Sequence, residues 1–354
     1  MTKDPAVLPA QGAILLIDKA EGWTSHDVVA KSRRALGTRK VGHAGTLDPM
    51  ATGLLVLGAG PSTRLLTHLV GLDKTYVATI RLGSATVTDD REGDRISTAA
   101  PEAIEALDAA QITQAAATLT GDIEQAPSAV SAIKVDGRRA YDRVRSGEAV
   151  ELPKRPVTVY EFRLGVPRRG QDETGAPVID LEATVRCSSG TYIRALARDL
   201  GEALGVGGHL TALRRTHVGP FDVADAAPTE SLAASAEQRT PLPLRAPTEV
   251  ATQLFPRVDL THEQAVDLGN GKRVELEAGD TGDSDSKVGS NGESDVGSNG
   301  DSDVGSDGDG DGAAMNAKLA AAVAPDGRLV GLVEVRRGRL RAVTNFPVEA
   351  GGAA

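Results

Sequence analysis

The segment with the clearest potential for chemistry is GHAGTLDPMATG at 42–53, which carries a single carboxylate, Asp48. Its three glycines allow tight backbone turns, and Pro49 restricts the chain directly after the carboxylate. A carboxylate held in this way can act as a nucleophile at a carbon atom without a metal. An aspartate in a glycine-rich loop is more often an ordinary turn residue. Here His43 lies five residues before Asp48, and a basic run precedes both, which favours a site.

Basic residues gather in two segments although the chain as a whole is acidic. The formal net charge is −10, but residues 280–311 hold ten carboxylates and one lysine, which leaves the rest near neutral. KSRRALGTRK at 31–40 has five cations and no acid, and KVDGRRAYDRVR at 134–145 has five cations and two acids. Either cluster alone is typical of a solvated surface. Together, beside a loop with a reactive carboxylate, they favour a polyanionic ligand such as RNA.

Cysteine and hydropathy patterns exclude several classes of protein. Cys187 is the single cysteine, so no internal disulfide can form, and no CxxC pair is present to hold zinc. We therefore expect no metal. The N-terminal residues lack a basic head followed by a long apolar stretch, and no apolar run approaches the ~20 residues of a membrane helix. We expect a cytoplasmic protein without membrane association.

The hydrophobic pattern predicts an α+β fold. Apolar runs and alternating residues predict strands, and periodic apolar stripes predict helices. The strands do not alternate regularly with helices, which indicates a largely antiparallel sheet. We predict strands at 13–18, 53–58, 74–83, 155–165, 178–187 and 209–221, helices at 26–36 (capped by Thr24 or Ser25), 101–119 and 191–204, a loop at 37–52 and a protruding, mobile segment at 121–147.

The C-terminal third predicts a separate, smaller module. Short strands at 273–279, 318–324, 328–335 and 339–346 predict a small β-barrel. The acidic segment interrupts it with an eight-residue repeat, VGSNGESD, VGSNGDSD and VGSDGDGD. Gly, Ser and Asp cannot bury enough apolar surface to order a chain, so we predict a disordered loop. Calcium binding by the Asp-Gly repeats is the alternative, although the glycine-rich nonapeptide of calcium β-helices is absent.

The motifs resemble one enzyme family in their order along the chain. GHAGTLDPMATG is very similar to the catalytic loop of the TruB family, the bacterial tRNA pseudouridine-55 synthases. The resemblance runs from about residue 12 to 222 and more weakly beyond. Ala20, where the family usually shows DKP, and the acidic insert are departures from the pattern. The other matching segments are LLIDKAEGWTSHDVV at 15–29, DKTYVATIRLG at 73–83, GDIEQAPSAVSAIKVDGRRAYDRVRSG at 121–147, CSSGTYIRALARDLGEALG at 187–205 and HLTALRR at 209–215.

The resemblance implies a pseudouridine synthase fold, with a mixed, largely antiparallel sheet flanked by helices and a small C-terminal PUA-like β-barrel. It also implies an order of domains. We expect a flexible tail at 1–10, a catalytic domain at 11–224 with an RNA-binding insertion at 121–154, a linker at 225–256, a PUA-like RNA-binding module at 257–279 and 313–350, and a disordered acidic insert at 280–312.

The resemblance also implies roles for six residues. Asp48 is expected to break the glycosidic bond, and Arg194 to pair with it and favour its charged form. Tyr76 is expected to lie against the target uracil and take part in proton removal, and Tyr192 to lie at the floor of the pocket. Without the resemblance, Tyr76 would be an ordinary core tyrosine. The remaining two are Leu213, expected to pack on the base although a core leucine otherwise, and His43, expected to enter the RNA loop although otherwise a loop histidine of no consequence.

The implied reaction is the isomerisation of uridine 55, in the T loop of tRNA, to pseudouridine. The enzyme would flip the base out of the stack, break its bond to the sugar, rotate it and rejoin it through carbon. No redox change occurs and no group is added, so we expect no cofactor. We expect the tRNA T-arm as partner, no obligate protein partner and a monomer. The sequence leaves open whether Asp48 attacks the sugar or the base.

Three other functions remain open at the level of sequence. One is a synthase acting on ribosomal or guide-directed sites, against which the absence of long basic extensions argues. Another is an RNA chaperone or binding module with incidental catalysis. The third is a glycosidase with paired carboxylates, which would need a second acid near Asp48. Asp89 and Asp90 are candidates for that acid by sequence only.

Overall fold

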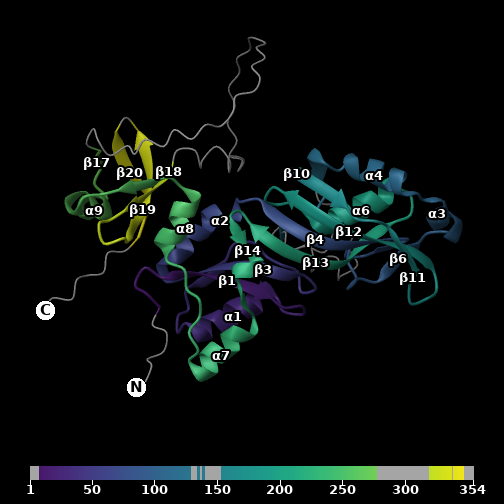
Figure 1. Cartoon of the computed structure of the whole chain (residues 1–354), viewed down its shortest axis with the longest axis horizontal. Coiled ribbons are helices and arrows are strands. Elements are labelled where there is room, and N and C mark those ends of the chain that lie inside the picture. Colours follow the sequence, from purple (N-terminus) through teal and green to yellow (C-terminus); the bar gives the residue numbers. More distant parts are fainter. Residues whose placement is uncertain are drawn as a thin grey trace, which may run out of the picture. The chain divides into compact units, whose positions relative to one another are not determined.

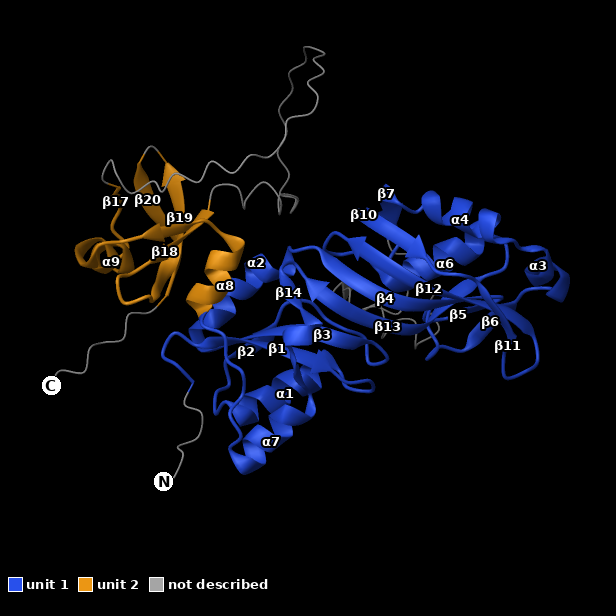
Figure 2. Cartoon of the chain, in the orientation of Figure 1, with its two compact units in different colours: residues 1–246 blue, residues 247–354 orange. Residues whose placement is uncertain are grey.

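The computed structural model describes residues 8–128, 134–135, 138–139, 153–276, 319–336 and 338–346. The chain divides into two compact units, Met1–Ala246 and Pro247–Ala354, coloured separately in Figure 2. Within the described residues, no helix is long and apolar enough to cross a membrane. The acidic segment predicted to be disordered at 280–312, the start of the tail and most of the predicted insertion lie outside these residues.

A mixed sheet forms the centre of the first unit (Figure 1). Most neighbouring strands are antiparallel, and the β1–β15 and β3–β13 pairs are parallel. With helices packed on it, this sheet confirms the predicted α+β fold. In sheet order the strands are β15 (Ala227–Pro228), β1 (Ala13–Lys19), β3 (Thr52–Ala59), β13 (Gly208–Val218), β4 (Lys74–Leu82), β12 (Pro177–Cys187), β10 (Arg155–Leu164) and β7 (Gly121–Gln125), while β2 (Val41–His43) pairs with β3, β14 (Phe221–Asp222) with β13 and β11 (Arg168–Gln171) with β12.

Two groups of helices pack on this sheet. α1 and α7 share a core with β1 and β3, and α3, α4 and α6 share another with β4 and β12. The predicted cap of α1 is confirmed, since Thr24 and Asp27 form a capping box. The helices are α1 (Ser25–Ala35), α2 (Leu66–Val70), α3 (Pro101–Ala106), α4 (Ala109–Ala117), α6 (Ile193–Ala203) and α7 (Glu230–Gln238), with short 3-10 turns η1 (Gly60–Leu65) and η2 (Val223–Asp225) and small ribbons β5 (Ser84–Thr86) with β6 (Arg95–Thr98) and β8 (Lys134–Val135) with β9 (Arg138–Arg139).

The second unit contains a five-stranded sheet among its described residues. Its central strands are buried and rich in Ala, Val and Leu. Two short helices contribute Val250 and Leu268 to the buried residues. The first falls in the predicted linker at 225–256, and the sequence analysis did not identify the second. In sheet order the strands are β16 (Arg257–Asp259), β18 (Leu319–Val323), β19 (Leu329–Arg336), β20 (Arg339–Asn345) and β17 (Val274–Glu275), and the helices are α8 (Pro247–Leu254) and α9 (His262–Gly269).

Three local predictions were wrong in detail. The segment predicted to protrude at 121–147 begins with β7, which pairs with β10 in the main sheet. The loop predicted at 37–52 contains the short strand β2, which extends the sheet beside β3. The single helix predicted at 101–119 is broken at Leu107, whose backbone is extended. Asp108 then starts a new helix with a capping box to Gln111. A side chain that satisfies free N–H groups at a helix start favours this break over continuation.

α6 lies unusually close to the backbone of β13 because Gly201 has no side chain. A Cβ atom at Gly201 would lie 2.1 Å from the backbone nitrogen of Gly208 and 2.2 Å from the carbonyl carbon of Gly207. Both contacts are to backbone, which cannot rotate away. The close approach fixes the position of the helix that begins directly after Tyr192.

We therefore expect Gly201→Ala to destabilise the protein, although alanine is the better helix former by ~1 kcal/mol. The overlap should outweigh that gain and lower the free energy of unfolding by about 1–3 kcal/mol, as overpacking does. Urea unfolding of the variant measures this change. Gly170→Ala is the control, since nothing lies within 4 Å of its Cβ position. An unfolding free energy raised by Gly201→Ala would contradict the packing described.

Candidate active site

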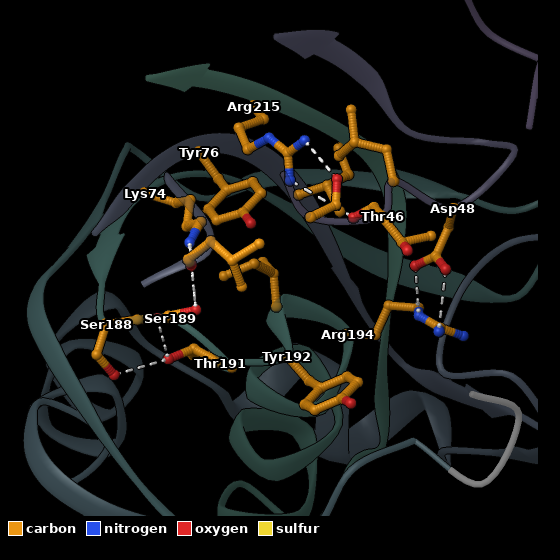
Figure 3. Close-up of a pocket in the computed structure, with 16 residues that line it drawn as sticks. Thr46, Asp48, Lys74, Tyr76, Ser188, Ser189, Thr191, Tyr192, Arg194 and Arg215 are labelled. Atoms are coloured by element: carbon orange, nitrogen blue, oxygen red, sulfur yellow. Dashed lines mark hydrogen bonds and ion pairs between the residues drawn. The ribbon is translucent and has the colours of Figure 1, made fainter. Parts of the chain in front are cut away.

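A cavity of about 420 Å³ opens in the first unit beside Asp48. Its size is within the ~300–1,000 Å³ of small-molecule sites. Figure 3 shows side chains from several segments turned toward it. Five of the six predicted residues line it: Asp48, Tyr76, Tyr192, Arg194 and Leu213. The other lining residues are Gly45, Thr46, Leu47, Val70, Lys74, Ser188, Ser189, Gly190, Thr191, Ile193 and Arg215.

Asp48 lies in the loop between β2 and β3, and its side chain is 37% exposed. The loop is tightly turned, with φ of +101° at Gly45 and +100° at Gly53. A Cβ atom at Gly53 would lie 2.2 Å from the carbonyl oxygen of Arg215, so only glycine allows the loop to approach β13 so closely. The glycines of the motif therefore position the carboxylate.

The Arg194 guanidinium binds Asp48 through two nitrogens (Figure 3). Its Nε lies 3.0 Å from Oδ2 of Asp48, and its Nη2 donates to Oδ1 over 3.4 Å. Nη1 lies 3.2 Å from Oδ2 of Asp90 and donates to the carbonyl oxygen of Thr88 over 2.9 Å. The Arg194 side chain is only 7% exposed. One buried cation is thus shared by two carboxylates.

Asp90 does not line the cavity and is not free to act as an acid there. Its side chain is 3% exposed and accepts hydrogen bonds from the Thr88 hydroxyl and the Glu92 backbone N–H. Asp89 is bound to Arg198 instead. Neither carboxylate faces Asp48 across the cavity, which argues against a glycosidase with paired acids.

Arg215 is a residue of the candidate site that the sequence analysis did not identify. It is 1% exposed and lines the cavity. Its guanidinium donates to the carbonyl oxygens of Gly45, Thr46 and Leu54 at 3.1, 3.4 and 2.7 Å. It therefore fixes the backbone on both sides of Asp48. The sequence signal that could have identified it was its place in the HLTALRR motif, two residues after Leu213.

Tyr76 and Leu213 bring an aromatic ring and an apolar chain to the cavity from the adjacent strands β4 and β13. Tyr76 is 8% and Leu213 7% exposed. Burial raises the pKa of Tyr76, while the nearby Arg215 opposes this increase. The phenol therefore keeps its proton at neutral pH, and the pair presents a surface on which a flat ring can pack.

Tyr192 is held at the first turn of α6 by the side chain of Gln125. The Gln125 amide accepts from the Tyr192 backbone N–H over 2.7 Å and donates to the Tyr192 carbonyl over 3.0 Å. Gln125 is 2% exposed, so this clamp is shielded from water. Burial raises the pKa of the Tyr192 hydroxyl.

Two buried lysines brace the loops around the cavity. Lys19 donates to the carbonyl of Pro49 over 3.2 Å and to that of Trp23. Lys74 lines the cavity and donates to Leu72 and to the Ser189 hydroxyl. Burial lowers the pKa of each ammonium from 10.5 to about 8. The full set of acceptors around each lysine stabilises the charge despite burial.

The structure does not place His43 at the cavity. It ends β2, paired with Leu57 of β3, and its ring contacts that of His26 edge-on at 6.0 Å between centroids. Burial lowers the pKa of His43, with His26 adding to the effect, so the ring is neutral at physiological pH.

The sequence matches two family models in succession. Residues 33–193 match the TruB family pseudouridylate synthase N-terminal domain, and residues 194–246 match the tRNA pseudouridylate synthase B C-terminal domain. The chain is 53% identical over 336 residues to tRNA pseudouridine synthase B of Leifsonia xyli subsp. xyli, across 95% of this chain and 97% of that protein. It is 54% identical over 258 residues to the protein of that name from Arthrobacter sp., across 73% and 80%.

Solved structures share the fold at lower identity. An H/ACA RNP bound to a substrate RNA containing 2′-deoxyuridine aligns with a TM-score of 0.60 and 20% identity, across 99% of this chain and 92% of that chain. A Cbf5-Nop10-Gar1 complex aligns with a TM-score of 0.58 and 22% identity, across 95% and 84%.

The buried charges around Arg194 predict a stability effect. Arg194→Met should lower the free energy of unfolding by about 3–5 kcal/mol, because Asp90 would be left as a buried charge without its cation. Adding Asp90→Asn should recover part of this loss, since the buried charge is then removed. Urea unfolding of both variants tests the pairing. A double variant less stable than Arg194→Met alone would show that Asp90 is not the residue left uncompensated.

Proposed function

The chain belongs to the TruB family of pseudouridylate synthases, and from this membership we propose that it converts uridine 55, in the T loop of tRNA, to pseudouridine. It is a tRNA pseudouridine synthase, an isomerase that moves the uracil base on its own sugar. The observation that carries the proposal is the ion-paired carboxylate of Asp48, at the wall of a cavity that also presents Tyr76 and Leu213.

The proposed reaction begins with extrusion of the uridine from the T loop, which costs a few kcal/mol. The base enters the cavity and packs on Tyr76 and Leu213, with Tyr192 at the floor. Asp48 then acts on the bond between N1 of the base and C1′ of the sugar, as nucleophile or as electrostatic partner. The bidentate contact with Arg194 orients both carboxylate oxygens before substrate arrives, which avoids reorganisation during the reaction.

The detached uracil then rotates and joins C1′ through C5. N1 gains a proton and C5 loses one, so the atoms balance without a redox partner or cofactor. Tyr76 lines the same cavity, which supports a part for it in removing the C5 proton. Because burial raises its pKa, the phenol can accept that proton only by passing its own proton on.

We assign the remaining contacts to the T-arm of tRNA. α1 carries Arg33 and Arg34 in its last turn, close in sequence to the catalytic loop. His43 would stack in the RNA loop where the flipped base had been, for which its neutral ring is suited. The segment 121–154 and the second unit would add RNA contacts. The protein would act as a monomer in the cytoplasm.

Asp48→Asn should abolish pseudouridine formation while the Kd for tRNA stays within about tenfold, a change of ~1.4 kcal/mol. Asparagine keeps the shape of the side chain but cannot act as a charged nucleophile. Single-turnover assays with tRNA transcript and filter binding measure the two quantities separately. Near-normal turnover would show that Asp48 is not the reacting group, and retained RNA function without any turnover in the wild type would favour a chaperone.

Removal of residues 280–311 should leave turnover intact and slightly tighten tRNA binding at low salt. These residues hold ten carboxylates and one lysine, and their repulsion of RNA is screened over ~8 Å at physiological salt. The gain should vanish as salt rises. A Gly/Ser segment of equal length is the control for loop length. Lost activity, or weaker binding at low salt, would show a positive role for the acidic segment.

A further inference from the structure

Two arginines one helical turn apart on α6 bind two consecutive carboxylates of a single loop. Arg194 binds Asp90, and Arg198 binds Asp89 with its Nη1 3.2 Å from Oδ2. Residues at positions i and i+4 of a helix lie on one face, so both guanidinium groups reach the loop that follows β5. Asp89 has a φ of +58°, which turns its side chain and that of Asp90 toward different partners.

The two arginines link this loop in different directions. Arg194 continues to Asp48, the proposed reacting group. Arg198 continues to Ala126, whose carbonyl oxygen accepts a hydrogen bond from Nη2 over 2.8 Å. Ala126 directly follows β7, at the root of the segment to which RNA binding is assigned. The side chains of Arg198 and Asp89 are 20% and 11% exposed, so this ion pair is largely shielded from solvent.

Other contacts hold the loop at 88–92 and the residues that directly follow β7. The Asp89 carbonyl accepts a hydrogen bond from the backbone N–H of Leu210 in β13. Beside the Ala126 contact, Gln125 clamps the Tyr192 backbone at the start of α6. Asp199 also binds Arg198, at 2.8 Å, and supplies the second negative charge on that guanidinium. A displacement of residues 125–126 would therefore also displace α6 and the loop at 88–92, which binds Arg194.

We propose that Arg198 and Asp89 form a positioning pair, which couples the root of the RNA-binding segment to the orientation of Arg194 and Asp48. The inference rests on the proposed function and assigns no direct contact between this pair and the substrate. With the pair intact, two arginines of α6 hold the loop at 88–92: Arg194 through Asp90 and Arg198 through Asp89. Without it, the loop keeps its contacts with Arg194 and with the Leu210 N–H but loses its link to Ala126, and the Asp48 carboxylate is oriented less tightly.

The test compares Arg198→Met, Asp89→Asn and the double variant in the full-length protein. Asparagine suits this position because it tolerates positive φ and matches aspartate in size. Each single variant should slow the single-turnover rate at saturating enzyme by about tenfold, while the Kd for tRNA stays within about threefold. The double variant should be no slower than the slower single variant, because both changes remove one interaction.

The control is Arg168→Met, which breaks an exposed pair with Glu182 at 2.8 Å on the edge of the same sheet. It should leave the single-turnover rate unchanged. Normal rates in the single variants, additive losses in the double variant, or equal slowing by Arg168→Met would each overturn the proposal. If Arg198→Met does not fold, Asp89→Asn alone decides by its rate. An inactive wild type would overturn the proposed function as well, whereas an active wild type with full-rate variants overturns only the coupling.

Discussion

A buried cation must be matched by negative charge, and Arg194 is the cation around which this site is built. Its guanidinium is almost inaccessible to water and has carboxylates on two sides. Asp90 is fully buried and held by backbone and hydroxyl donors, so it fixes one end of the guanidinium. The Nε and Nη2 atoms at the other end of the guanidinium are thereby fixed in position, and they determine where the more exposed Asp48 carboxylate lies. Charge balance in the interior thereby sets the geometry at the cavity wall.

Buried cations also stabilise the irregular backbone of the site. The loop that carries Asp48 has few regular hydrogen bonds of its own, and buried cations supply the missing donors. Arg215 satisfies the carbonyls of Gly45 and Thr46, and Lys19 satisfies that of Pro49. A carboxylate held this way needs little rearrangement when charge develops during the reaction, which is the condition for electrostatic catalysis. The glycines serve this arrangement by allowing the loop to approach β13.

Much of the fold could be predicted because alternating and periodic apolar residues report directly which face is buried. β2 was missed because three residues in a glycine-rich stretch give no such pattern. The burial of two adjacent residues of the same type was harder to predict. Arg214 is part-exposed and pairs with Asp18, whereas Arg215 is buried against the loop that carries Asp48. Strand register decides between them, and the sequence does not show it.

Five predicted site residues line one cavity although they come from four separate segments of the chain, and the prediction that they lie together came from motif resemblance and not from the hydrophobic pattern. Asp89 and Asp90 show the limit of sequence reasoning, since their partners depend on a positive φ at Asp89 and on the arginine spacing of α6. His43, predicted to enter the RNA loop, lies outside the lining of the cavity. Its proposed role is in the RNA loop and not in this cavity.

Nucleotide-resolution mapping of pseudouridine in an unmodified tRNA transcript, after incubation with the wild-type protein, tests the account most directly. The account predicts one new pseudouridine, at position 55 of the T loop. A transcript with cytidine at that position should acquire none. Pseudouridine at another position, or none in the unmodified transcript, would contradict the assignment of this site to the T-loop uridine.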